Sequence, residues 1–400
     1  MRILSEVNVK NLVCLTRVDF NCPLDSEKNI LDDTRIRTHA ETVRYLASQK
    51  GKVVVIAHQG RPSSPDFGSL EGHAEILQEV LGKNYRVDFI PFTHGSEVET
   101  SIAAMSEGNI LLLENVRMVP NETKNKTPED HAKDPYIESL CRVGDIFVND
   151  AFSTAHRNHM SLVGFPPKMR SYAGLIMERE IKNLQRVMDS PDKPCVFVMG
   201  GIKPEDSFKV AEYVLSRDIA DYVLTGGGIS LILLKALEYL LGETNEEFLR
   251  QTGLLTFVDI AKRLINLFPN QIKSQIDFAC MADGKRNFRL NDLPLPYPIL
   301  DIGDKTIETY STLVENASTV VYNGPMGKIE EKGFEIGTVE ILRAMGHTKG
   351  FTLAGGGHSV AIIEKHNIKN LSYVSTSGGA MLQFLMGKEL PAITVLKAYR

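Results

Sequence analysis

The sequence lacks the features of several protein classes. A formal net charge of −5 and an isoelectric point near 6.1 leave no sign of the strongly basic domain that nucleic-acid binding usually requires. The most apolar stretch, Ile229 to Leu241, includes Lys235 and Glu238 and is therefore unsuited to span a bilayer. The opening residues are too polar for a secretory signal. We therefore expect a soluble, cytoplasmic protein that binds neither nucleic acid nor membrane.

Cysteine is scarce and scattered along the chain. The five cysteines form an odd-numbered set without a Cys-x-x-Cys pair, which predicts reduced thiols in place of a disulfide framework or a zinc site. No group of His, Asp and Glu residues has a familiar ligand spacing, so metal ligands are unknown at this stage. For His58, His156 and His159 we expect hydrogen bonding.

Two common nucleotide-binding patterns are missing as well. No Gly-Lys pair is followed by Ser or Thr, which excludes a Walker A loop. The glycine triplets run on to Leu231 and Val360, where a Gly-x-Gly-x-x-Gly motif would have its last glycine. Any nucleotide must therefore bind by a different glycine scheme.

Continuous runs of Val, Ile and Leu recur along the 400 residues, with helical patterns between them. Such runs are typical of parallel strands that are buried on both faces, and their alternation with helices predicts βαβ units. The length suggests two or three domains. We therefore expect an α/β fold of two doubly wound, parallel-sheet (Rossmann-like) domains. The runs begin at Leu12, Val53, Ile110, Ile146, Val196, Val223, Val320 and Phe351.

One helical pattern lies between two proline-containing segments. Met177, Ile181, Leu184 and Met188 recur at helical spacing, which predicts a hinge helix joining the domains, although an ordinary surface helix is the alternative. The expected boundaries are residues 1–171 for the N-terminal domain, 172–189 for the hinge helix and 190–389 for the C-terminal domain. Residues 123–134 are expected to form a polar loop.

Arginine and histidine follow the runs of the first half. A single arginine after a strand is usually a solvated charge. Several of them in consecutive βα loops would meet at one sheet edge and repel one another unless an anion binds there. The arginine fork suits carboxylate and phosphate, so the ligand should be small and multiply anionic. The residues concerned are Arg17, His58, Arg61, Arg117, His156 and Arg157.

Glycine clusters follow the runs of the second half. Glycine allows a phosphate to approach the main chain, and the N-terminus of a following helix adds partial positive charge. One triplet is weak support, but this chain has several such clusters, including Gly226-Gly227-Gly228 and Gly355-Gly356-Gly357. A small anion facing a nucleotide is the layout of a kinase.

Taken in order, these motifs resemble the phosphoglycerate kinase family over nearly the whole chain. His358 and Ser207 make the chain most similar to the archaeal branch. The strings that carry the resemblance are Arg17-Val18-Asp19-Phe20-Asn21, His58-Gln59-Gly60-Arg61-Pro62, Glu114-Asn115-Val116-Arg117, Asn149-Asp150-Ala151-Phe152 with Ala155-His156-Arg157, Gly200-Gly201-Ile202-Lys203, Gly226-Gly227-Gly228, Leu300-Asp301-Ile302-Gly303, Asn323-Gly324-Pro325-Met326-Gly327 and Gly355-Gly356-Gly357.

The resemblance implies a substrate for each domain. The N-terminal domain, with the C-terminal tail 390–400 packed back on it, would bind 3-phosphoglycerate through Asp19, Phe20, Asn21, Arg35, His58, Gln59, Gly60, Arg61, Arg117, His156 and Arg157. The C-terminal domain would bind ATP or ADP through Gly201, Lys203, Gly228, Asn323, Glu330, Gly355, Gly356, Gly357, His358 and Ser359, with Mg²⁺ carried by the nucleotide phosphates. Arg35, Lys203 and Gly357 would be catalytic.

The implied reaction is reversible phosphoryl transfer between 1,3-bisphosphoglycerate and ADP, which belongs to glycolysis and gluconeogenesis. We expect in-line transfer after hinge closure, in a monomer or a homodimer. A nucleotide-binding regulatory paralogue, or a kinase for a related sugar acid, is the alternative. Two departures from the family pattern bear on the nucleotide site, namely His358 in place of an Asp and Ser207 in place of a second lysine, with Lys209 close by.

Overall fold

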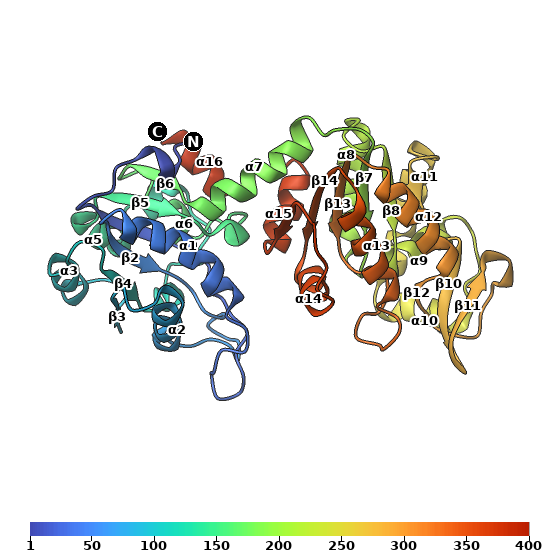
Figure 1. The fold of residues 1–400 in the computed structure, drawn as a ribbon, viewed down its shortest axis with the longest axis horizontal. Helices are drawn as coiled ribbons and strands as arrows, with labels where there is room; N and C mark the ends of the chain where they lie inside the picture. The colour runs from blue at the N-terminus through green and yellow to red at the C-terminus, as the bar shows by residue number, and fades with distance from the viewer. Residues whose placement is uncertain (400) are drawn as a thin grey trace. The chain divides into compact units, whose positions relative to one another are not determined.

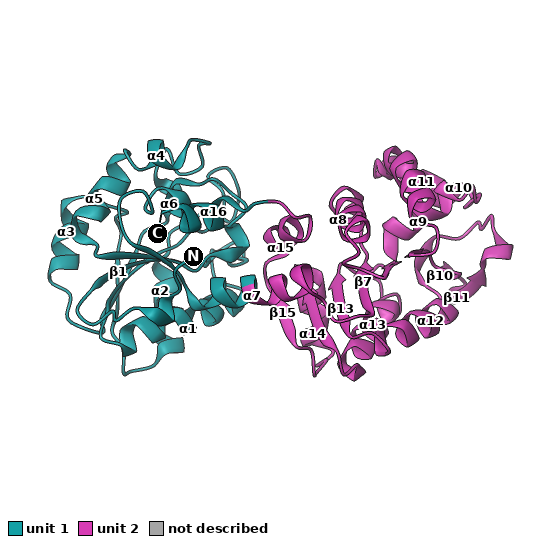
Figure 2. Ribbon diagram, turned by 90° about the horizontal axis from the view of Figure 1, so that it is seen from above, with its two compact units in different colours: residues 1–181, 389–400 teal, residues 182–388 magenta. Residues whose placement is uncertain are grey.

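The computed structural model describes residues 1–399 and divides them into two compact α/β units. Unit 1 comprises Met1–Ile181 together with the described residues from Glu389 on, and unit 2 comprises Lys182–Lys388 (Figure 2). Each unit is built around its own six-stranded sheet.

Unit 1 has an all-parallel sheet with the strand order β3-β4-β2-β1-β5-β6. Alternate residues of a strand enter different cores: Val53 and Val55 pack with α1 and α2, whereas Val54 and Ile56 pack with α3 and α5. Two buried faces explain why these strands are continuously apolar. The strands are β1 (Val13–Arg17), β2 (Lys52–Ile56), β3 (Val87–Ile90), β4 (Ile110–Leu113), β5 (Ile146–Asn149) and β6 (Ser171–Ala173); the helices are α1 (Thr34–Ser48), α2 (Glu71–Leu81), α3 (Ser96–Ala103), α4 (Pro128–His131), α5 (Pro135–Val143), α6 (Met160–Val163) and the short 3₁₀ turns η1 (Leu4–Glu6), η2 (Val116–Met118) and η3 (Phe152–Thr154).

Unit 2 repeats the parallel arrangement with the strand order β15-β14-β13-β7-β8-β9 and adds an antiparallel sheet, β11-β10-β12 (Figure 1). Its strands are β7 (Cys195–Met199), β8 (Tyr222–Thr225), β9 (Ile272–Lys273), β10 (Asp277–Ala282), β11 (Gly284–Arg289), β12 (Ile299–Ile302), β13 (Thr319–Asn323), β14 (Phe351–Gly355) and β15 (Tyr373–Ser375). Its helices are α8 (Pro204–Ser216), α9 (Gly227–Ala236), α10 (Glu243–Gln251), α11 (Val258–Leu267), α12 (Asp304–Glu315), α13 (Ile336–His347), α14 (Gly357–Lys365), α15 (Gly378–Leu385) and the 3₁₀ turns η4 (Leu254–Phe257) and η5 (Leu290–Asp292).

The predicted fold class is confirmed, and each of the eight apolar runs is a strand. The antiparallel sheet was not predicted, because β11 is largely exposed and carries mostly polar residues. The segment 123–134, predicted as a loop, contains α4, whose first turn is capped by Thr127 Oγ1 accepting from Asp130 N at 3.2 Å.

Helix α7 (Leu175–Asp189) occupies the segment for which a hinge helix was predicted. It is shorter than the range 172–189, because residues up to Ala173 form β6 beside β5. The apolar residues of its spacing pattern are buried at Met177, Ile181 and Leu184. The helix crosses the boundary between the two units at Ile181, and its function as a hinge stays a prediction.

Helix α16 (Pro391–Ala398) belongs to unit 1, the same unit as the N-terminus (Figure 1). Ala392 N donates to Ala155 O at 3.1 Å, and Ile393, Val395 and Leu396 are buried. The first turn of α16 therefore contacts the segment that follows β5. Separately, the described residues contain no helix long and apolar enough to cross a membrane.

We predict that Leu396→Ala lowers the free energy of unfolding of unit 1 by about 2–4 kcal/mol, because it removes a side chain that is 1% exposed and leaves a cavity. Lys397→Ala, the exposed neighbour on the same helix, is the matched control and should change stability little. Urea unfolding with hydrogen exchange read in unit 1 measures both. Equal stabilities for the two variants would show that α16 is not part of this core.

Candidate functional site

The four central strands of unit 1 end at one edge of its sheet, and each is followed by predicted site residues. In the order β4-β2-β1-β5, these strands lead to the segments 114–117, 57–61, 18–21 and 150–157. The register pairs Arg17 at the end of β1 with Ile56 on one side and Asn149 on the other. The parallel topology therefore brings together loops that are more than a hundred residues apart in the sequence.

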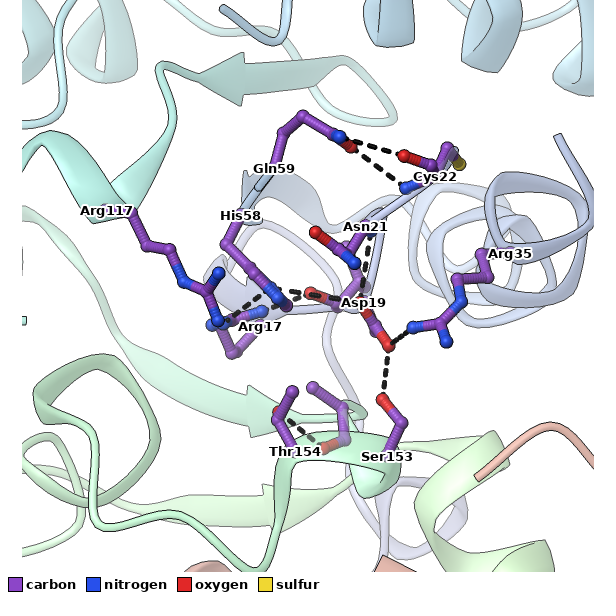
Figure 3. Close-up of polar contacts among 12 residues, drawn as sticks. Arg17, Asp19, Asn21, Cys22, Arg35, His58, Gln59, Arg117, Ser153 and Thr154 are labelled. Atoms are coloured by element: carbon purple, nitrogen blue, oxygen red, sulfur yellow. Dashed lines mark hydrogen bonds and ion pairs between the residues drawn. The ribbon is translucent and has the colours of Figure 1, made fainter. Parts of the chain in front are cut away.

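Asp19 is the centre of a hydrogen-bonded group at this edge (Figure 3). Its Oδ2 accepts from Arg35 Nη1 and from Ser153 Oγ, and its Oδ1 accepts from Asn21 N at 3.1 Å. Burial alone would raise the pKa of Asp19, but Arg35, then two neighbouring histidines and then the Ser153 hydroxyl outweigh burial and hold that pKa well below its ordinary value. Asp19 is therefore ionised at neutral pH and holds Arg35, whose side chain stays 36% exposed, by one end.

The loop after β2 is tied to its neighbours through main-chain and amide groups. Asn21 Oδ1 accepts from Gly60 N at 2.8 Å, and Arg117 Nη1 donates to Gly60 O. Gly60 has φ +65°, and a Cβ there would lie 2.4 Å from the Asp66 main chain, so only glycine fits. Both amide ends of the Gln59 side chain are used inside the protein, so Gln59 shapes the loop.

Arg17 differs from the other arginines because its guanidinium is turned inward and the side chain is 1% exposed. Its Nε donates to Ser161 Oγ at 2.9 Å, its Nη1 donates to Val18 O, and its Nη2 lies 3.2 Å from His58 Nδ1. The expectation that Arg17 offers its charge to a ligand is therefore wrong. Phe20 is likewise wholly buried in the core.

The contact with Arg17 decides the protonation of His58. A guanidinium can only donate, so Nδ1 of His58 must accept, which leaves the proton of the neutral ring on Nε2. Burial, more than the neighbouring arginines, lowers the pKa of His58 well below its ordinary value. His58 is thus a neutral imidazole with an N–H on Nε2.

The remaining arginines form a cluster of repelling charges. Burial, and then the charges of Arg157 and Arg17, lower the pKa of Arg117 to about 10. Nε of Arg117 is buried and has no hydrogen-bond partner within residues 1–399. Burial, and then the charge of Arg61, lower the pKa of Arg157. The pKa of His156 is lowered by burial and then by Arg157. A multiply charged anion would reduce the repulsion between these charges and would accept a hydrogen bond from Arg117 Nε.

The carboxyl edge of the unit 2 sheet carries glycine in place of arginine. Strands β14, β13, β7 and β8 lie in this order and lead to Gly356, Gly324, Gly200 and Gly226. The loops are linked through their main chains: Gly201 N donates to Pro325 O at 2.7 Å, and Gly227 N donates to Met326 O at 2.7 Å. Of the predicted nucleotide-binding residues, Gly228 lies in the first turn of α9.

Helix α14 begins at this edge with an open N-terminus. Gly356 precedes it with φ +93°, and a Cβ there would lie 3.1 Å from Asn323 Oδ1. A Cβ on Gly357 would meet no atom within 4 Å. Ser359 Oγ is buried and has no hydrogen-bond partner among the residues that the structure describes, so it offers a donor and an acceptor to a ligand here. A hydroxyl that is free to hydrogen-bond, at the N-terminus of a nine-residue helix, is suited to bind a phosphate.

The two lysines after β7 have different surroundings. Lys203 is exposed and stands at the N-cap position of α8. Lys209 is also exposed, but its Nζ donates to Glu205 Oε1 at 2.6 Å along the helix. Ser207, which stands between them, is buried and donates to Lys203 O at 3.3 Å. Of these two lysines, Lys203 therefore stands nearer in the chain to the Gly200-Gly201 turn.

Asp301 binds the first turn of α13, the helix that follows the loop of Glu330. Its Oδ2 accepts from Gly337 N at 2.7 Å, and its Oδ1 accepts from Ile302 N at 2.9 Å. Lys285 Nζ reaches the same loop and donates to Gly333 O at 2.9 Å. Glu330 itself is exposed. The antiparallel sheet thus supports this loop through Lys285 at its edge strand β11 and the following helix through Asp301 on β12.

Within residues 1–399, no group of three or more His, Cys, Asp or Glu side chains is placed to hold a metal ion. Mg²⁺ is commonly bound with few protein ligands and with oxygens of substrate phosphates. Ser359 Oγ and the Asn323 Oδ1 beside Gly356 are oxygen atoms that could serve as metal ligands, whereas the exposed His358 offers a nitrogen atom. The residues present therefore fit an Mg²⁺ held chiefly by phosphate.

Two α/β units, one with a cationic edge and one with a glycine-lined edge at helix N-termini, define a kinase of small anionic substrates. The chain matches the family model described as "Phosphoglycerate kinase" over residues 4–388. It is 40% identical to the phosphoglycerate kinase of Methanobacterium bryantii, with 98% of this chain and 96% of the relative covered. The crystal structure of phosphoglycerate kinase from Pyrococcus horikoshii has a TM-score of 0.92 at 39% identity, covering 100% and 99% of the two chains, and that from Coxiella burnetii has 0.83 at 30% identity, covering 99% and 98%.

The chain belongs to the phosphoglycerate kinase family. The predicted family, with its likeness to archaeal members, and the predicted class of enzyme, a phosphotransferase with a carboxyl group as acceptor, are confirmed. Neither the regulatory paralogue nor the sugar-acid kinase is favoured. The roles of individual site residues stay predictions.

Sequence reasoning did not find several residues that organise the site. Ser153 bonds to Asp19, and Glu122 and Ser161 lie beneath the arginine cluster. Glu122 is a single acidic residue in a polar segment, and nothing in the local sequence indicates that it is buried. The signal for Asp301 was its place inside the apolar run of β12, between Leu300 and Ile302, which is typical of a buried carboxyl.

We predict that Asp301 makes the stability of unit 2 depend on pH. Burial raises the pKa of Asp301 to about 7 against the two main-chain hydrogen bonds, so between about pH 4 and pH 7 the folded state binds more protons than the unfolded state. The free energy of unfolding must then fall as the pH rises through this window. Asp301→Asn lacks this dependence, so its stability relative to the parent should improve by about 2–4 kcal/mol from pH 5 to pH 8.

Urea unfolding at both pH values measures this change, with the exposed Asp304→Asn as the matched control. A stability difference between Asp301→Asn and the parent that is the same at pH 5 and pH 8 would show that Asp301 does not keep its proton in the folded state.

Proposed function

We propose that this chain catalyses reversible phosphoryl transfer between 1,3-bisphosphoglycerate and ADP, giving 3-phosphoglycerate and ATP, as a step of glycolysis and gluconeogenesis. The observation that carries the proposal is the arginine cluster of unit 1, in which the buried Arg117 Nε lacks a partner within the described chain. Membership of the phosphoglycerate kinase family supports the choice of substrate.

The phosphate of 3-phosphoglycerate would be held by Arg61, Arg117 and Arg157, whose mutual repulsion it relieves. Asp19 would accept a hydrogen bond from the hydroxyl group of the ligand's carbon chain, and the side-chain amide of Asn21 would donate one. His58 would donate through Nε2, since its Nδ1 is engaged by Arg17. Gln59, Gly60, Phe20 and His156 would shape the loops around the ligand.

The chemistry of the transfer needs no general base. The nucleophile is the substrate carboxylate, which is already ionised at neutral pH because carboxyl pKa values lie about 3 units below 7. The proposed catalytic groups therefore supply charge and orientation. Arg35, held at one end by Asp19, and Lys203 would face the phosphoryl group, together with the amide of Gly357.

The nucleotide would lie along the glycine-lined edge of unit 2. The N-terminus of α14, with Gly355, Gly356 and Ser359, would receive phosphate, and Gly201, Gly228 and Asn323 would border it. Glu330 would bind the ribose from the loop before α13, the helix that Asp301 binds. Mg²⁺, when bound through the phosphates, would neutralise their charge; Ser359 and Asn323 offer the oxygens that suit it, and the nitrogen of His358 suits it less.

Because the two substrates are assigned to separate units, in-line transfer requires the units to approach each other. We propose that α7, which contributes residues to both units, accommodates this hinge closure. All five cysteines are free in the described chain, in keeping with a reducing, cytoplasmic location. The protein would act as a monomer or a homodimer.

We predict that Arg61→Ala and Arg157→Ala each raise KM for 3-phosphoglycerate by about tenfold or more, because each removes a charge-assisted hydrogen bond to phosphate. KM for ATP should change less than about twofold, since the nucleotide is assigned to unit 2. Steady-state kinetics with each substrate varied in turn measures the two constants.

Arg86→Ala is the matched control, because Arg86 is an exposed arginine of unit 1 that precedes β3 and pairs with Asp88. It should leave both KM values unchanged. Equal increases in the two KM values for Arg61→Ala or Arg157→Ala would refute the assignment of 3-phosphoglycerate to unit 1.

We predict that Lys203→Met lowers kcat/KM by about a hundredfold or more, because it removes charge from the transferring phosphoryl group. Lys209→Met should lower kcat/KM by less than about threefold, since Lys209 is engaged with Glu205 on the exposed face of α8. The two variants remove the same charge from one segment and control for each other. A larger loss for Lys209→Met would mean that Lys209 takes the place of the lysine missing at Ser207.

A further inference from the structure

Glu122 is a buried carboxyl in unit 1 that the proposed reaction does not use. It follows η2 in the chain and is 1% exposed. Its Oε1 accepts from Ser161 Oγ at 2.7 Å, and its Oε2 accepts from Ser161 N at 2.9 Å. Its own carbonyl accepts from Met160 N at 2.9 Å, so Glu122 joins the loop after β4 to the start of α6. A carboxyl buried this deeply is costly unless it is paired.

Ser161 links Glu122 to Arg17, and His159 Nδ1 lies 3.9 Å from Glu122 Oε1 on another side. The Ser161 hydroxyl donates to Glu122 and accepts from Arg17 Nε at 2.9 Å. Burial lowers the pKa of Arg17 and raises the pKa of Glu122 to about 7, and in each case the opposite charge of the other residue is the largest effect that opposes burial. At its other end Arg17 reaches His58 Nδ1 at 3.2 Å. Four side chains, from the loop after β4, from α6, from the end of β1 and from the loop after β2, therefore form one hydrogen-bonded series.

We infer that Glu122 is a positioning residue for substrate recognition: through Ser161 it holds Arg17, and Arg17 holds His58 in the tautomer that carries the proton on Nε2. The inference rests on the proposed function, because His58 is assigned there as a donor to 3-phosphoglycerate. If the series is broken, Arg17 can rotate away from Nδ1, and the neutral ring can place its proton on either nitrogen.

A purely structural role for Glu122 would be to pin the loop after β4 to α6. That role predicts a loss of stability with no change in the His58 ring. The positioning role predicts a change in the ring itself, before any substrate is added. The tautomer of His58 therefore separates the two roles.

Ser161→Ala is the variant to test, because it removes the link while leaving Glu122, Arg17 and His58 in place. The matched control is Ser139→Ala, a buried serine of unit 1 with the same double role: its hydroxyl donates to Glu99 Oε1 at 2.6 Å and accepts from Gly95 N at 3.1 Å. Both changes remove one buried hydroxyl that joins a carboxyl to an N–H group. Thermal unfolding of each variant establishes that it is folded.

The first measurement is the ¹⁵N spectrum of the His58 ring in the full chain without substrate, at a pH where the ring is neutral. We expect a single Nε2-protonated tautomer in the parent and in Ser139→Ala, and averaged nitrogen shifts in Ser161→Ala. An Nε2-protonated ring in Ser161→Ala identical to that of the parent would overturn the inference.

The second measurement is KM for each substrate. Ser161→Ala should raise KM for 3-phosphoglycerate by about fivefold, the worth of one weakened hydrogen bond, and leave KM for ATP and kcat within about twofold. Ser139→Ala should change neither KM. A KM for 3-phosphoglycerate that rises equally in the two variants, or in neither, would overturn the inference.

Should Ser161→Ala fail to fold, Glu122→Gln serves in its place. Glutamine has the same shape and can still meet the Ser161 amide, but it removes the charge opposite Arg17. We expect its KM for 3-phosphoglycerate to rise and its His58 ring to show some Nδ1 protonation, and a parental ring would overturn the inference. Because the ring is observed without substrate, the Arg61 and Arg157 variants can refute the proposed function independently of this result.

Discussion

A buried charge needs hydrogen-bond or ion-pair partners inside the protein. At the carboxyl edge of the unit 1 sheet, this requirement of Arg17 determines how the surrounding residues are arranged. The guanidinium closes the central strand β1 and is 1% exposed, so its donors have to be met inside the protein. Ser161, Val18 and His58 meet them, and Glu122 lies behind Ser161. The loops after four strands are held in one arrangement as a result. The exposed groups, Arg35 and Arg61, are then placed by neighbours that cannot move freely.

The two units show one topology carrying two kinds of chemistry. In both, four neighbouring parallel strands deliver their loops to one edge, and helices begin there. Unit 1 fills the edge with side-chain cations around Asp19, which suits a small ligand that brings phosphate and carboxylate. Unit 2 leaves the main chain bare at Gly356 and Gly357 and, among its described residues, a hydroxyl without a partner at Ser359, which suits a chain of phosphates. The sheet supplies position, and the residues after each strand supply specificity.

Some residues fix the geometry of a loop or helix that carries other site residues. Gly60 is required because the Asp66 main chain leaves no room for a Cβ, and this close approach brings its carbonyl to Arg117. In unit 2, Asp301 holds the first turn of α13, the helix that follows the loop of Glu330, by accepting from Gly337 N. Neither residue is required to touch a ligand in order to matter for binding, because each fixes the geometry of residues that are assigned to do so.

The sequence by itself determined the class of fold and the character of each edge. Runs such as Val53 to Ile56 and Ile110 to Leu113 are apolar throughout because both faces of a parallel strand are buried, and that pattern can be read without a structure. The motif strings likewise determined the family. Only the tertiary structure decided that Arg17 turns inward while Arg61 stays exposed, since both simply follow a strand in the sequence. The partnership of Glu122 with Arg17 was equally out of reach, because it joins residues 105 positions apart. Burial and partner choice depend on which loops the folded sheet brings together, and local sequence does not contain that information.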